Sequence, residues 1–229
     1  RCIFEVSLCV NEVLMDLYIV GVVIIISMIQ SIFGVGVLLF GTPILLMLGY
    51  DFVSVLSILL PISLVINFLQ IVRDKKHIDV SYYKLLLQYS ILPIVLCLVF
   101  SLKVGLDVSV LIGVFLLLTA LKPWSLGIEK AVLFIFKFER PFFVFQGVIH
   151  GLTNLGGSLL TSHIHTLKLS KVEKRATISM SYFTFAFFQI STLMFLGEMQ
   201  ELNGNFLVIG VITFILTEYF IYSNISNKK

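Results

Sequence analysis

Long apolar runs separated by short polar stretches dominate the pattern of this chain. A helix that spans a lipid bilayer needs about 20 mostly apolar residues. Runs that approach or reach this length cover residues 52–72, 85–102, 106–121, 177–196 and 206–222. Each run predicts a spanning α-helix, so the fold class that we expect is an all-α, polytopic membrane protein.

Two further apolar regions are interrupted by small and polar residues. Residues 17–48 are too long for one untilted span, and Gly34 and Gly36 interrupt them. Residues 141–167 are interrupted in the same way near Gly156, and an offset of 120 residues lays this region over the first without a gap. Paired, broken segments are typical of repeated transporter folds with a central binding site. We therefore expect two repeats, each a Gly-broken segment followed by spanning helices.

The boundaries of these repeats follow from a short charged stretch in the middle of the chain. The apolar piece at residues 131–138 is flanked by lysines, glutamate and arginine, which is typical of an interfacial helix. We interpret residues 123–139 as an interfacial linker and hinge. Residues 1–122 then form the first repeat with its N-terminal segment, and residues 140–229 form a second repeat that is one span shorter.

The basic residues favour one topology over another. If both broken segments cross the membrane, the 16 Lys and Arg residues divide almost evenly between its two sides. If both segments are re-entrant hairpins, all of these residues except Arg1 and Lys103 fall on one side. The positive-inside rule favours the second arrangement, in which the hairpins enter from opposite faces and the repeats are inverted. Arms of ~14 residues would carry each hairpin tip beyond the midplane.

The tips of the two broken segments are the candidate binding elements. Glycine permits a tight turn, lets a ligand approach the backbone, and leaves amide N–H groups at the start of the following helix. Two helix N-termini that point at one central volume favour an anion. The alternative is that these glycines only allow helices to pack closely in a membrane.

Polar side chains near the tips complete the candidate site. The expected substrate-binding residues are Gln30, Gly34, Gly36, His150, Asn154, Gly156, Gly157 and Ser158. Further candidates to line the same cavity, in the spans that follow, are Ser57, Ser63, Asn67, Ser181 and Gln189. An ionisable group deep in a membrane segment is usually functional, so His150 is interpreted as a proton carrier or a hydrogen-bond donor to an anion, or else as a neutral bond between helices. The spacing of the histidines and cysteines predicts neither a metal site nor a cofactor.

Composition narrows the class of protein further. Hydrophobic residues make up 59% of the 229 residues and charged residues only 13%, whereas a soluble domain has ~45–50% and ~25%. This excludes a water-soluble enzyme and a nucleic-acid partner, and it makes the lipid bilayer the main environment. The net charge of +3 is what basic loops beside a membrane would give.

The two glycine-containing segments resemble the signature of the TauE/SafE family, the group of sulfite exporters and toluene-sulfonate uptake permeases. In that signature a G-x-G-G-G stretch is followed five residues later by Pro, once in each half. The segment from Gly34 to Pro43 fits the frame, with Val37 and Leu38 in place of two glycines. The second copy begins at Asn154 and has a histidine where the proline is expected.

The resemblance implies a secondary permease, and not an enzyme, that moves small sulfur-containing anions such as sulfite or organosulfonates across a bacterial inner membrane. Coupling to protons or to the membrane potential is implied as well. One alternative is a membrane subunit that does not transport. Another is an intramembrane hydrolase in which Ser158 is the nucleophile and His163 or His150 is the base.

Overall fold

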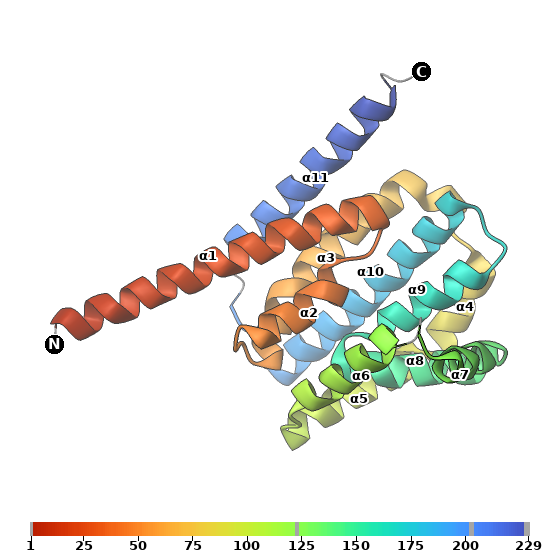
Figure 1. The fold of residues 1–229 in the computed structure, drawn as a ribbon, viewed down its shortest axis with the longest axis horizontal. Coiled ribbons are helices and arrows are strands. Elements are labelled where there is room, and N and C mark those ends of the chain that lie inside the picture. The colour runs from red at the N-terminus through yellow and green to blue at the C-terminus, as the bar shows by residue number, and fades with distance from the viewer. Residues whose placement is uncertain (1, 122–123, 202–203, 227–229) are drawn as a thin grey trace.

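The computed structural model describes residues 2–121, 124–201 and 204–226, and the regular structure in these ranges is entirely helical. The helices follow one another with short turns between them (Figure 1). They are α1 (Cys2–Phe33), α2 (Val37–Met47), α3 (Phe52–Asp74), the 3-10 helix η1 (Lys75–His77), α4 (Val80–Tyr89), α5 (Ile91–Val104), α6 (Val108–Leu121), α7 (Leu126–Phe136), α8 (Glu139–Thr153), α9 (Gly156–Thr166), α10 (Lys171–Leu196) and α11 (Gly204–Ser226). The predicted all-α class is confirmed.

Several helical stretches are long and apolar enough to cross a membrane, which confirms the polytopic architecture. They are Met15–Phe33, Phe52–His77, Val80–Val104, Lys171–Leu196 and Gly204–Ile221. All but Met15–Phe33 coincide with predicted spans. The run at 106–121, which was also expected to span, forms α6 with only 14 residues. At 1.5 Å per residue it reaches about 21 Å, less than the thickness of a bilayer core.

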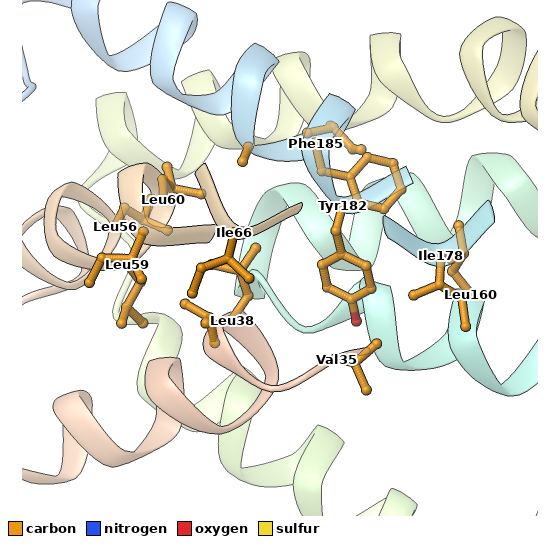
Figure 2. Close-up of a cluster of buried hydrophobic side chains, with 14 of the residues drawn as sticks. Val35, Leu38, Leu56, Leu59, Leu60, Ile66, Leu160, Ile178, Tyr182 and Phe185 are labelled. Carbon is orange, nitrogen blue, oxygen red and sulfur yellow. The ribbon is translucent and has the colours of Figure 1, made fainter. Parts of the chain in front are cut away.

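Helices α3 and α10 lie side by side at the centre of the bundle (Figure 1). They run antiparallel, because Asp74 at the end of α3 forms an ion pair with Arg175 near the start of α10, with the two charged atoms 2.9 Å apart. Side chains of α2, α3, α9 and α10 meet in the buried apolar cluster of Figure 2. The other helices are arranged around this central pair.

Polar side chains fix where the two central helices begin. Asp51 caps α3 by accepting hydrogen bonds from the N–H groups of Val53 and Ser54. Burial raises the pKa of Asp51, but the hydrogen bonds from Ser54 and Val53 outweigh it and hold the pKa below its usual value. A capping box of Ser170 and Glu173 starts α10.

The first broken segment folds into a helical hairpin, here called the first hairpin. Its arms are α1 and α2, and its tip is formed by residues 34–36. Asp16 on α1 and Tyr50 beyond α2 line the same cavity of about 230 Å³, so both outer ends of this hairpin lie at one end of the bundle. The tip lies at the other end, because a Cβ atom placed on Gly34 would be 3.0 Å from Arg175 Cγ.

The first arm is longer than the ~14 residues expected from the sequence. The apolar part of α1, Met15–Phe33, is 19 residues long. Between Leu17 and the tip only Gly21 strongly disfavours a helix, so the helix continues without a break. The tip therefore reaches the level of Asp74, at the end of α3, and not only the middle of the bundle.

The second broken segment folds into a second hairpin, with arms α8 and α9 and a tip formed by residues 154–155. The rings of Phe142 on α8 and His163 on α9 are 4.4 Å apart, so the outer ends of these arms also lie together. Lys174 in the first turn of α10 donates to the carbonyl of His165, which places these ends near the start of α10.

The two hairpins thus enter the bundle from opposite ends of α10. Their placement relative to a bilayer stays a prediction. So do the boundaries of the repeats and the hinge role of residues 123–139, of which α7 and the start of α8 are described.

Candidate functional site

The first tip is closed by a side chain of its own hairpin. Gly34 has a φ of +79°, and its N–H donates to the carbonyl of Gln30 at 2.8 Å. The Gln30 side chain then accepts from the N–H of Val37 at 3.2 Å and donates to the carbonyl of Gly34 at 3.0 Å. The N-terminus of α2 therefore has a partner within the protein, which differs from the expectation that its N–H groups would be open to a ligand.

A buried network extends from Gln30 across the central helices. The Gln30 amide also donates to the side-chain oxygens of Asn67 and Gln70 on α3. Ser179 on α10 donates to the same oxygen of Gln70 at 2.9 Å. Because Asn67 in turn donates to Ser63, the amide groups of this network are hydrogen-bonded to one another or to the backbone. The first tip thus carries a network of hydrogen-bonded amides that joins α1, α3 and α10.

The second tip repeats the geometry of the first at the same offset of 120 residues. Asn154 has a φ of +61°, and its N–H donates to the carbonyl of His150 at 2.8 Å. The N–H of Gly157 donates to Nδ1 of His150 at 3.2 Å. His150, Asn154 and Gly157 therefore make the backbone contacts that Gln30, Gly34 and Val37 make in the first hairpin.

Gly36 and Gly156 are the points where the arms of each hairpin touch. A Cβ atom on Gly36 would be 2.8 Å from the backbone nitrogen of Gln30, and one on Gly156 would be 2.4 Å from the carbonyl oxygen of Gln146. Atoms of the preceding arm occupy the space that a side chain would need at these two glycines. Gly36 and Gly156 therefore allow the arms to pack closely, which is the alternative role considered for them. Gly157 differs, because a Cβ atom there would be 2.4 Å from the Tyr182 hydroxyl.

Near the first tip the hydroxyls of Ser27 and Ser31 lack partners among the described residues, whereas a larger set of buried polar atoms is unpartnered at the second tip. His150, Tyr182 and Gln189 are at most 3% exposed. Among the described residues, His150 Nε2, the Tyr182 hydroxyl and both polar atoms of the Gln189 amide have no hydrogen-bond partner. Gln189 lies beside His150 and Thr161 lies beside Tyr182, but neither pair reaches hydrogen-bonding geometry. Buried polar groups in proteins are normally satisfied, so this cluster is the candidate ligand site.

Asn154 and Ser158 face other parts of the structure. The Asn154 amide donates to the Thr42 hydroxyl at 2.9 Å, which joins the second tip to α2 of the first hairpin, while its Oδ1 has no partner among the described residues. Ser158 donates to the carbonyl of Leu155 at 2.8 Å and lines an apolar groove of about 700 Å³ between α2, α6, α7, α8 and α9.

Among the described residues Ser158 donates to the Leu155 carbonyl, and no hydrogen bond joins it to His163 or His150, the bases that the hydrolase alternative needs. A serine nucleophile needs a histidine base within hydrogen-bond reach. His163 instead pairs with the Tyr82 hydroxyl at 3.1 Å, and Nδ1 of His150 is occupied by the N–H of Gly157.

Sequence reasoning found most of the residues around the second tip but missed Tyr182. Gln189 and His150 stand out because amide and imidazole groups are rare in apolar runs. Tyrosine is common in such runs and gave no signal by itself. The available clue was that positions 182 and 189 lie two helical turns apart and so share a face.

These features define a class, a helical membrane protein with two buried hairpins that meet at a polar cluster. A family model described as "Sulfite exporter TauE/SafE" matches residues 19–220, nearly the whole chain. The chain therefore belongs to this family of membrane permeases, as predicted, and is an integral membrane transporter. No match was found among curated proteins or among solved structures.

Proposed function

We propose that this protein is a secondary permease for small sulfur-containing oxyanions, such as sulfite or organosulfonates, in the bacterial inner membrane. The observation that carries the proposal is the cluster of buried, unpartnered polar atoms at the second tip of a chain from a permease family. Ordered water or ligands normally satisfy such groups.

The chemistry of the second tip favours an anion. The N-terminus of α9 begins at Gly156, and the positive end of a helix dipole favours negative charge. Donor groups of His150 and Gln189 remain available nearby. We assign the substrate site to His150 and Gly157 of the second hairpin, while Asn154 and Ser158 support its tip through their contacts with Thr42 and Leu155. Gln30, Gly34 and Gly36 form the corresponding support in the first hairpin, and Gly156 sets the spacing of the arms.

We also propose that residues 1–122 and 140–229 are inverted repeats joined by the linker at 123–139. The matching contacts of Gln30 and His150 support this relation. So do the opposite directions of the hairpins and the antiparallel arrangement of α3 and α10. Inverted repeats around a central site allow alternating access without an ATP site.

The test is transport by the purified protein in proteoliposomes. Radiolabelled sulfite or methanesulfonate is presented outside vesicles loaded with the same unlabelled anion, and exchange is followed over time. We expect exchange to exceed that of empty vesicles and to fall at least tenfold in His150→Leu. A protein that inserts correctly but gives no flux above empty vesicles would favour the alternative of a subunit that does not transport.

A further inference from the structure

The tautomer of His150 follows from its contact with the second tip. The N–H of Gly157 can only donate, so Nδ1 of His150 must accept and carries no proton. The proton of the neutral ring is therefore on Nε2. An imidazolium would place a second N–H against the N–H of Gly157 and break this contact. His150 thus presents a neutral Nε2–H donor that is fully buried and has no acceptor among the described residues.

Tyr182 presents a second such donor between the two tips. Its ring lies against Gly157 on the second hairpin, and its hydroxyl points toward Val35 of the first tip (Figure 2). Leaving a buried hydroxyl without a partner is unfavourable. Among the described residues the Tyr182 hydroxyl has no hydrogen-bond partner, so it is available to a bound ligand.

Gln189 completes the set from the same face of α10. It lies two turns beyond Tyr182 and beside His150, with its NH₂ group unpartnered among the described residues. The three side chains belong to two helices, α8 and α10, and all three are buried. Three donors on separate side chains match an XO₃ group, whose oxygen atoms diverge from one centre.

We propose that His150 Nε2–H, the Tyr182 hydroxyl and the Gln189 amide bind the oxygen atoms of a small oxyanion, and that His150 stays neutral throughout transport. This rests on the proposed function. It adds Tyr182 and Gln189 to the site, and it chooses the donor role of His150 over the proton carrier. The first hairpin supports this choice, since the Gln30 amide, which does not titrate, accepts from Val37 and donates through Nε2.

The role of Tyr182 is tested with Tyr182→Phe. We expect KM for methanesulfonate exchange to rise about tenfold, equivalent to ~1.4 kcal/mol, while the melting temperature in detergent stays the same or rises. The matched control is Tyr83→Phe, because the Tyr83 hydroxyl already pairs with Thr184 at 2.9 Å. This control should lower stability and leave KM unchanged. An unchanged KM in Tyr182→Phe would overturn the assignment.

The charge state of His150 is tested by the pH dependence of transport. His150→Gln, which keeps a donor but cannot titrate, should still exchange methanesulfonate with a raised KM, whereas His150→Leu should lose the exchange. Methanesulfonate is the probe, because it stays singly charged at every pH that the protein tolerates. We expect the pH profile of His150→Gln to match that of the wild type. A variant that exchanges substrate but no longer responds to a pH gradient would overturn the neutral-donor proposal and favour the proton carrier.

A binding assay distinguishes an error in the proposed donor set from an error in the proposed permease function. Stabilisation of the purified protein by methanesulfonate or sulfite is measured in a thermal shift assay, without transport. A wild-type protein that binds these probes without moving them overturns the permease proposal, and loss of the shift in Tyr182→Phe still supports the donor set. A wild-type protein that binds neither probe overturns both.

Discussion

Single atoms decide how closely the arms of each hairpin approach. At Gly156 a methyl group would lie 2.4 Å from the Gln146 carbonyl oxygen and 2.6 Å from the His150 nitrogen. Both are backbone atoms of α8, which cannot rotate away as a side chain would. The arms would have to separate, and the contact between Gly157 and His150 would be lost with them.

We therefore predict that Gly156→Ala lowers the free energy of unfolding by about 1–3 kcal/mol or more, as overpacking does. The matched control is Gly21→Ala in α1, where no atom lies within 4 Å of the added methyl group. It should be neutral or stabilise by up to ~1 kcal/mol, because alanine favours helix more than glycine. Melting temperatures of the purified variants check this, and equal effects of the two substitutions would contradict it.

At the residue scale, the sequence predicted which side chains are unusual but not which atoms are satisfied. Gln30 and His150 were found because polar groups are costly in apolar segments. Gln30 is fully hydrogen-bonded because Asn67 and Gln70 face it. His150 faces Gln189 instead, and its Nε2 has no partner among the described residues. These partners come from distant helices, so spacing along the chain could not reveal them.

At the scale of elements, the length of apolar runs predicted most helices well, and local breaks were harder to place. The span at Val80–Val104 divides into α4 and α5 at Ser90, whose hydroxyl donates to the Phe143 carbonyl and the Gln146 side chain of α8. That contact joins two helices that are distant in the sequence, so the hydrophobic pattern of neither helix predicts it. The hairpins were predicted from their glycines, but the contact between them was not.

One hydrogen bond joins the two hairpins, and we predict that it couples them energetically. Thr42→Val removes the acceptor of the Asn154 amide at almost constant volume, in a site where both residues are buried. A buried donor without a partner costs about 1–3 kcal/mol. The matched control is Thr119→Val, whose exposed hydroxyl donates only to carbonyls of its own helix.

A double-mutant cycle with Asn154→Leu measures this coupling. We expect Thr42→Val to destabilise the wild type by more than it destabilises the Asn154→Leu variant. Equal effects in both backgrounds would show that the two hairpins are energetically independent. Thr119→Val should have the same small effect in both.

At the scale of the whole molecule, ion pairs and hydrogen bonds identify which helix ends lie together. The end of α3 and the start of α10 meet at Asp74 and Arg175, and Glu218 on α11 pairs with Arg73 at the same end. The opposite end is marked by Ser54, which donates to Gln200 beyond α10. By the positive-inside rule we expect the end with the basic residues to face the cytoplasm.

We therefore predict the side of the membrane on which three exposed positions lie. In a variant with serine at positions 2, 9 and 97, single cysteines replace Lys76, Lys171 and Glu201, which are all exposed. A thiol reagent that cannot cross the membrane, applied to intact cells, should label only the Glu201 position, and permeabilisation should expose the other two. The span Val80–Val104, α6 and the second hairpin lie between Lys76 and Lys171. Labelling of Lys171→Cys but not Lys76→Cys from outside would therefore mean that the hairpin crosses the membrane or that α6 does not. The halves would then not be inverted, and the balance of basic residues would no longer set the orientation.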